Sequence, residues 1–176
     1  LSLRRQRQMC IRDSISVNKT NSVIDRVSAM TEDQISEDKK NKLVGEAKFL
    51  RATLYFALVS AWENIPLVSS ETLSFDNLLV SQDNNSDGTI DSADTKMVYD
   101  LIIEDLLYSE SVLEEGQGGG RATKGAAQTL LGKVYLQMTG FPLFETDKFA
   151  FAEAKLEAVI NSGIYPVSYT HLTLPT

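Results

Sequence analysis

The chain has very few of the side chains on which many enzymes and metal sites depend. Its 176 residues include one Cys (Cys10) and one His (His171), which nearly excludes disulfides, Cys–His nucleophile pairs and Cys/His metal sites. No apolar run approaches the roughly 20 residues of a membrane-spanning helix. Basic residues are also in deficit, 17 against 24 acidic ones. This balance argues against the phosphate backbone of a nucleic acid as a partner.

The two ends of the chain are related to each other through their codons. Codons for Val167 to Thr176 can be chosen so that the opposite strand encodes Arg4 to Asp13, with all ten residues matching. Ten consecutive complementary codons do not arise by chance, and the pattern resembles a translated sequencing adapter. We therefore predict non-native tails at residues 1–14 and 167–176. The alternative is a pair of native tails.

The natural segment predicted at 15–166 is poorer still in reactive side chains. The tails hold four Arg, one Asp, Cys10 and His171, so the segment keeps 13 basic and 23 acidic residues, a net charge of −10, and neither Cys nor His. The whole chain is 43% apolar and 23% charged, which indicates a soluble globular domain with a real core. We expect it to be an internal fragment of a longer protein.

Apolar residues recur with the period of a helix over most of the chain. This period predicts one weak and four strong helices, at 22–30, 38–62, 92–114, 123–138 and 149–160. No segment shows the alternation that is typical of a strand. The sequence therefore predicts an all-α fold whose neighbouring helices run antiparallel.

The helix predicted at 38–62 carries two apolar stripes. One comprises Ala47, Leu50, Leu54, Leu58 and Ala61, and the other comprises Ala52, Tyr55, Val59 and Trp62. Together they leave the second half of the helix apolar nearly all round, which predicts burial on several sides. Its aromatic side chains are accordingly expected mainly in the core.

The helix predicted at 123–138 contains part of a repeat motif. Residues 131–136, LGKVYL, match the L-G-x-x-Y core of the first helix of a tetratricopeptide repeat (TPR). Residues 151–163 suit the second helix of that repeat, and small residues such as Gly125 and Gly132 provide a smooth face for close helix approach. The motif predicts a helix pair that buries its apolar face by stacking on neighbours, in a TPR-like array.

Residues 83–94, DNNSDGTIDSAD, have the ligand spacing of a calcium-binding loop. The candidate ligands at positions 1, 3, 5, 7, 9 and 12 are Asp83, Asn85, Asp87, Thr89 (through its carbonyl), Asp91 and Asp94. Gly88 stands where the turn needs a residue without Cβ, and Ile90 is expected to plug the loop into the core. The final Asp in place of Glu resembles the dockerin variant. The loop predicts a structural Ca²⁺ site, and an acidic surface turn is the alternative.

The helix at 38–62 also carries a signature. Residues 46–68, EAKFLRATLYFALVSAWENIPLV, are similar to the signature of the SusD/RagB family, which they match at Ala47, Phe49, Leu50, Arg51, Ala52, Tyr55, Phe56, Leu58, Trp62, Pro66 and Leu67. Residues 98–113, 120–138 and 151–167 resemble the blocks that follow in that family, in the same order. The calcium-type loop lies between the first two blocks, where the family is variable.

The resemblance implies an outer-membrane lipoprotein on the extracellular face of the cell, attached by a lipid anchor absent from this fragment. Such proteins bind oligosaccharides or other nutrients, without catalysis, as partners of a SusC-like TonB-dependent transporter. They are several-fold longer than the natural segment, which would be part of their helical, TPR-like portion. Two alternatives are a TPR-like scaffold that binds proteins and a glycosidase with paired carboxylates, although 23 acidic residues make some close pair inevitable.

Individual ligand-binding residues are hard to assign from this pattern. Trp62 is a weak candidate for stacking on a sugar, since aromatic faces suit apolar sugar faces, but a Trp on a buried helix is more often part of the core. Arg51 is expected to make an internal ion pair or to cap a carbonyl. The loop at 67–82 is the better place for ligand or transporter contacts, and Phe75 is its one aromatic residue.

Overall fold

The computed structural model describes residues 3–62, 64–73, 82–116 and 119–165, with side chains from Ser14 onward. These residues form helices and no strand, which confirms the predicted all-α class. The helices are α1 (Leu3–Ser28), α2 (Glu37–Trp62), α3 (Ser92–Val112), α4 (Lys124–Met138) and α5 (Lys148–Asn161).

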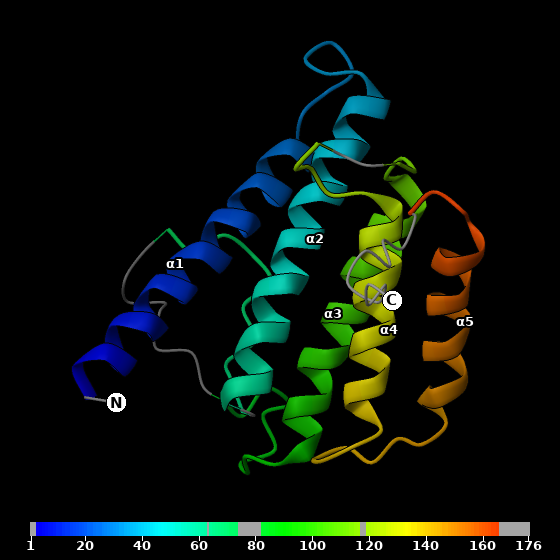
Figure 1. The fold of residues 1–176 in the computed structure, drawn as a ribbon. Helices are drawn as coiled ribbons and strands as arrows, with labels where there is room; N and C mark the ends of the chain where they lie inside the picture. The colour runs from blue at the N-terminus through cyan, green and yellow to red at the C-terminus, as the bar shows by residue number, and fades with distance from the viewer. Residues whose placement is uncertain (1–2, 63, 74–81, 117–118, 166–176) are drawn as a thin grey trace, which may run out of the picture.

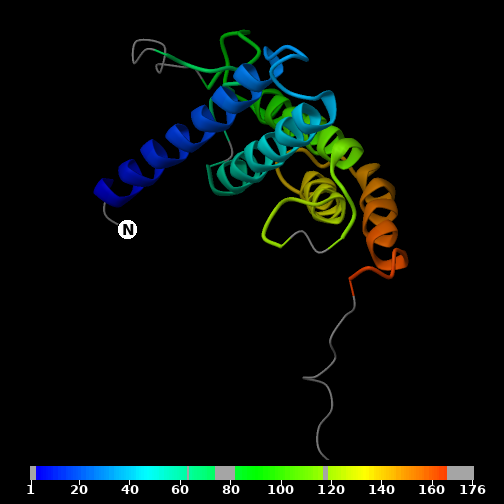
Figure 2. The same cartoon turned by 90° about the horizontal axis from the view of Figure 1, so that it is seen from above.

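Consecutive helices run antiparallel and pack side by side (Figure 1). Seen from above, α3 lies behind α2 and α4, which share one side of the array, and α5 forms the far edge (Figure 2). Accordingly α3 packs strongly on both α2 and α4, whereas α2 and α4 touch each other only weakly. The arrangement is the helical array that the sequence predicts.

The bounds of α2 to α5 agree with the predicted helices to within two residues. Thr123 caps α4, since its side chain accepts a hydrogen bond from the Ala126 N–H. The prediction for α1 is wrong, because the helix spans 3–28 instead of 22–30. Its inward side carries Val17, Asn21 and Ile24. Because Asn21 is polar, these positions do not form the continuous apolar stripe from which a helix is predicted. The backbone of α1 continues through the predicted tail, whose boundary stays a prediction.

The core lies where α3 meets its neighbours, and it is built from large side chains that exclude solvent almost completely: Tyr55, Tyr99, Ile102, Leu106, Leu131, Val134 and Met138. Glycines allow two of the close contacts. A Cβ on Gly132 would lie 2.6 Å from Leu156 Cγ, and one on Gly45 would collide with Val112. The expected smooth face of α4 is therefore confirmed at Gly132, where α5 packs.

Neither of the two apolar stripes on α2 is buried along its whole length. Ala52, Tyr55 and Val59 are buried, but Leu50 is 54% exposed and Trp62 is 40% exposed. The expectation that both stripes are buried is therefore wrong in part. Leu50 is exposed because the side of α2 shared with α4 is left open. Trp62 is exposed because it is the last residue of α2.

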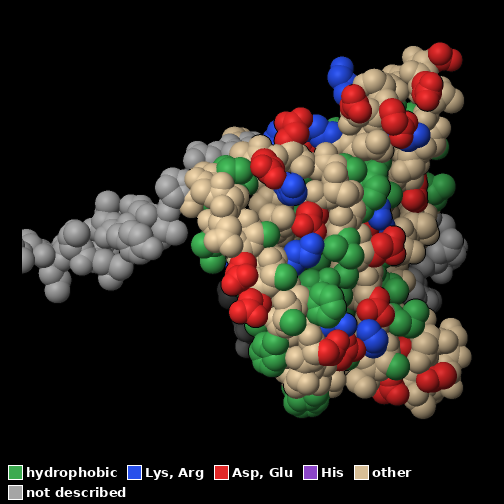
Figure 3. All heavy atoms as spheres, turned by 90° about the vertical axis from the view of Figure 1, so that its right-hand side faces the viewer, with side chains coloured by type: hydrophobic (Ala, Val, Ile, Leu, Met, Phe, Trp, Pro, Cys, Tyr) green, Lys and Arg blue, Asp and Glu red, His purple; other side chains and the backbone are tan. Residues whose placement is uncertain are grey.

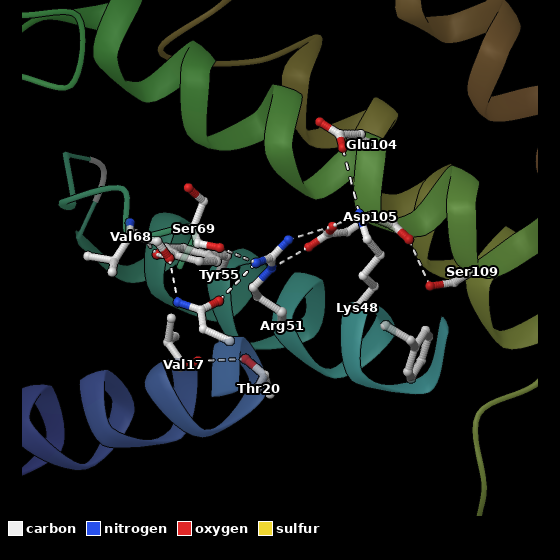
Figure 4. Close-up of polar contacts among 12 residues, drawn as sticks. Val17, Thr20, Lys48, Arg51, Tyr55, Val68, Ser69, Glu104, Asp105 and Ser109 are labelled. Atoms are coloured by element: carbon white, nitrogen blue, oxygen red, sulfur yellow. Dashed lines mark hydrogen bonds and ion pairs between the residues drawn. The ribbon is translucent and has the colours of Figure 1, made fainter. Parts of the chain in front are cut away.

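A buried ion pair joins α2 to α3 (Figure 4). Arg51 donates through Nε to Asp105 Oδ2 at 2.6 Å and through Nη2 to Asp105 Oδ1 at 2.8 Å. Its Nη1 donates to Asn21 Oδ1 of α1 and to the Ser69 carbonyl, both at 2.8 Å. Lys48 adds a contact of 2.9 Å to Asp105. The expectation of an internal ion pair and carbonyl cap at Arg51 is confirmed.

Replacing Arg51 by Met should lower the free energy of unfolding by about 3 kcal/mol, because Asp105 then stays buried with only Lys48 as a cationic partner. Urea denaturation measures the change. Arg26→Met is the matched control, since Arg26 pairs with Glu71 at the surface, where ion pairs contribute little. Equal losses in the two variants would contradict the structural role of Arg51.

Candidate functional site

A hollow of about 360 Å³ lies where the end of α2 meets α1. Its apolar lining comes from Val17, Tyr55, Leu58, Trp62, Ile65, Pro66 and Val68. Polar side chains also line it: Ser14, Asn18, Asn64, Thr72 and Gln82. An apolar recess with a few polar groups is the usual form of a small-molecule site.

Trp62 is the largest side chain in this hollow. Trp62 is the last residue of α2 and is 40% exposed, so its side chain is not fully packed in the core. Pro66, four residues after Trp62, lines the same hollow. Asn64 and Pro66 end α2 at this point. A partly exposed indole beside an apolar wall can stack on a flat, weakly polar ligand face.

One wall of the hollow is an extended segment, residues 65–72, held by side chains instead of a neighbouring strand. The Tyr55 hydroxyl donates to the Val68 carbonyl at 3.0 Å and accepts from the Val68 N–H at 2.8 Å. Asn18 binds both backbone groups of Thr72, at 3.0 and 2.7 Å. Asn21 donates to the carbonyls of Val68 and Ser70. The wall is thus fixed from α1 and α2.

Two ionisable side chains at the wall, Tyr55 and Glu71, have shifted pKa values. Burial raises the pKa of Tyr55 above its ordinary value, so the hydroxyl keeps its proton and can both donate and accept. At the outer edge, hydrogen bonds from Arg26 and then Ser22 hold the pKa of Glu71 below its ordinary value. Glu71 is therefore a carboxylate at neutral pH, and Arg26 neutralises it.

In the calcium-type loop, hydrogen bonds join Asp83, Asn85 and Asp87 in one turn. The Asp87 N–H donates to both Asp83 Oδ1 (3.1 Å) and Asn85 Oδ1 (3.0 Å), which brings these two oxygens to one point. Asp87 in turn accepts from the Thr89 N–H and hydroxyl. Gly88 has φ +92°, so the turn needs glycine as the spacing predicts.

Asp94 connects the loop to the start of α3 through its two carboxylate oxygens. It is fully buried and accepts hydrogen bonds from the N–H groups of Asn84, Asn85 and Asp91. These bonds, the one from Asp91 first, hold the pKa of Asp94 below its ordinary value. Together with Asp91 it forms the capping box of α3. Among the described residues, no three carboxylate, His or Cys side chains converge on one point.

The prediction that Ile90 plugs the loop into the core is wrong, since Ile90 is 52% exposed. Asn84 makes the inward connection instead. Its side chain accepts from the Leu67 N–H at 2.9 Å and donates to the carbonyl of Ile65 at 3.0 Å. The loop is therefore attached to the wall of the hollow through hydrogen bonds.

Sequence reasoning missed the asparagines that build this region. Asn18, Asn21 and Asn84 each bind backbone groups more than 15 residues away. For Asn18 and Asn21 the only signal in the sequence is an Asn at helical spacing from apolar residues, which is weak on its own. Asn84 lies in the loop before α3 and has no such signal. Phe75, the aromatic residue noted in the 67–82 loop, lies outside the described residues.

Comparison with known proteins assigns the family. The model of a SusD-like family described as "Starch-binding associating with outer membrane" matches residues 14–136. This chain belongs to the SusD-like family. The finding confirms the resemblance drawn from the α2 signature.

Similar proteins include a SusD-like protein of Bacteroides ovatus, 34% identical over 125 residues, which are 71% of this chain and 21% of that protein. A SusD superfamily protein from Parabacteroides distasonis has a TM-score of 0.74 and 27% identity, over 86% of this chain and 30% of that structure. A crystal structure with a xylogluco-oligosaccharide has a TM-score of 0.67 and 27% identity, over 88% and 29%.

This SusD-like chain thus spans about a fifth of its curated relative and under a third of the solved structures. Nearly all of its fold recurs inside proteins that are several-fold longer. Among the described residues, no helix is both long and apolar enough to cross a membrane.

Proposed function

We propose that the protein containing this chain binds oligosaccharides at the extracellular face of the outer membrane, without catalysis. Membership of a family described as starch-binding supports this proposal. So does the likeness to a structure with a xylogluco-oligosaccharide at 27% identity. A SusC-like TonB-dependent transporter as partner, and a lipid anchor, rest on the family resemblance.

Within this chain, the observation that carries the proposal is the exposed face of Trp62. The partly exposed Trp62 lines a hollow of about 360 Å³ whose lining is mixed, with apolar side chains and a few polar ones. Asn64 and Gln82 place amide groups at the same hollow. A sugar ring offers an apolar face to an indole and hydroxyls to amides, so this lining fits a saccharide better than a purely apolar ligand.

The protein-binding scaffold is the second candidate. The TPR-like packing of α4 on α5 favours it. It predicts affinity for proteins and none for glycans. The glycosidase has no support in the described residues beyond the abundance of acids.

Trp62→Ala should weaken the binding of xyloglucan oligosaccharides roughly tenfold, because it removes a stacking contact of about 1.4 kcal/mol. Isothermal titration calorimetry on the longer protein measures the change, and Trp62→Phe, which keeps an aromatic face, should retain most of the affinity. Affinity that is unchanged in Trp62→Ala would exclude this hollow as a sugar contact. Absence of glycan binding by the parent protein would favour the scaffold.

We also propose a structural Ca²⁺ at residues 83–94. The oxygen spacing and the meeting of Asp83 and Asn85 at one N–H support it. The residues that would hold the ion are Asp83, Asn85, Asp87, Asp91 and the Thr89 carbonyl. The described position of Asp94 fits less well, because its oxygens bind backbone N–H groups of the loop and of the start of α3. The ion would neutralise repulsion between carboxylates.

Calcium at about 1 mM should raise the melting temperature by a few degrees, since an ion that binds only the folded chain stabilises it. Differential scanning calorimetry measures the shift, and Asp87→Ala should abolish it. Asp100→Ala on the exposed side of α3 should keep it. Asp94→Ala should lower the melting temperature with or without calcium. A calcium shift that survives in Asp87→Ala would mean that the site is wrong.

A further inference from the structure

The hollow beside Trp62 has a lining that is polar in part but carries no charge. Among the described residues, no charged side chain lines it. Its polar groups are hydroxyls and amides, from Ser14, Asn18, Tyr55, Asn64, Thr72 and Gln82. Such groups can exchange hydrogen bonds with sugar hydroxyls. They cannot neutralise a carboxylate or a sulfate that loses its water, and burying such an ion without a partner is costly.

The sequence around the hollow carries negative charge only. Residues 52–95 supply the whole described lining apart from the part that comes from α1. They include seven acidic residues and no Lys, Arg or His. On the α5 side of the molecule, by contrast, Lys and Arg side chains lie among the acidic ones (Figure 3). The field at the hollow should therefore repel an anionic ligand.

Two arginines contact the wall of the hollow, but both are already paired. Arg51 is 3% exposed, and its donors are used by Asp105 and by a carbonyl of the wall itself. Arg26 pairs with Glu71 at the outer edge. Neither guanidinium lines the hollow. An anionic ligand could bind either one only by disrupting its present pair, and disrupting the buried pair is the more costly of the two.

The orientation of the Asn64 amide is fixed from α3. Thr95 is fully buried, and its hydroxyl donates to Asn64 Oδ1 at 2.6 Å. No hydrogen bond among the described residues uses the side-chain N–H groups of Asn64, so they can donate to a ligand. Gln82 Nε2 donates to the Asn64 backbone carbonyl at 3.1 Å, which leaves the Gln82 amide oxygen as an acceptor. The hollow thus offers a donor and an acceptor beside Trp62, and a sugar hydroxyl can use both.

We propose that the hollow beside Trp62 binds uncharged sugar units and rejects uronic acids and sulfated sugars, and that Asn64 is the donor that recognises a sugar hydroxyl. The proposal rests on the saccharide binding proposed above and adds the charge of the ligand. Trp62 stacks on the apolar face of the sugar ring, Asn64 donates and Gln82 accepts. Because the lining contributes no charge, the affinity should not depend on salt.

Isothermal titration calorimetry on the longer protein tests the selection by charge. The neutral probes have four glucose units in the main chain and come from starch, laminarin and xyloglucan. The anionic probe is tetragalacturonate, a uronic acid chain of the same length. The tightest neutral probe should bind at least roughly tenfold more tightly than tetragalacturonate. Its affinity should be the same in about 50 and about 500 mM NaCl, because no ion pair forms.

Two substitutions in the lining should change the selection in opposite ways. Gln82→Lys places a cation in the hollow and should strengthen tetragalacturonate binding roughly tenfold. Asn161→Lys, at the exposed end of α5, is the matched control and should not change it. Asn64→Asp replaces the N–H donor by a carboxylate of the same shape, which Thr95 can still bind, and should weaken the tightest neutral probe roughly tenfold. Circular dichroism of each variant checks that the helices are intact.

The outcomes separate this proposal from the proposed function. Tetragalacturonate that binds as tightly as the neutral probes and loses affinity in Trp62→Ala would overturn the selection by charge, while saccharide binding would stand. Neutral binding that is unchanged in both Asn64→Asp and Trp62→Ala would also overturn the proposal, because the sugar would then lie elsewhere. Failure of every probe to bind would overturn the proposed function together with the proposal that rests on it.

Discussion

The buried ion pair between Arg51 and Asp105 is the interaction on which the rest of the structure depends. Burying two charges is costly, and a pair repays that cost only where its remaining donors and acceptors are satisfied. Here the guanidinium also binds Asn21 and the Ser69 carbonyl, and the carboxylate also binds Lys48. One charge pair therefore joins α1, α2, α3 and the extended segment that follows α2.

The candidate site is a consequence of that junction. The extended segment has no partner strand, so its backbone groups depend on side chains of Asn18, Asn21 and Tyr55. These contacts fix the segment to α1 and α2, so that it forms one wall of the hollow beside Trp62. This SusD-like chain thus presents a partly exposed aromatic side chain beside the hollow at the end of α2.

Much of this architecture could be predicted from the sequence, because helical periodicity and capping are local. The bounds of α2 to α5 and the cap at Thr123 followed from such signals, whereas the internal role of Arg51 was expected at a position that matches the family signature. Exposure could not be predicted at Leu50 or Trp62, since it depends on which neighbours cover α2. Asp94 shows the same limit: its spacing suggests a metal ligand, whereas hydrogen bonds in three dimensions make it a helix cap.

Amide hydrogen exchange in Arg51→Lys tests most directly whether the ion pair positions the wall of the hollow. The substitution keeps the charge but loses the planar fork that reaches Asp105, Asn21 and Ser69 at once. We predict that the N–H groups of Val68 and Thr72 exchange much faster, while those of Ile102 and Leu106 in α3 stay protected. Unchanged exchange at Val68 and Thr72, or a uniform loss of protection across the chain, would contradict this account.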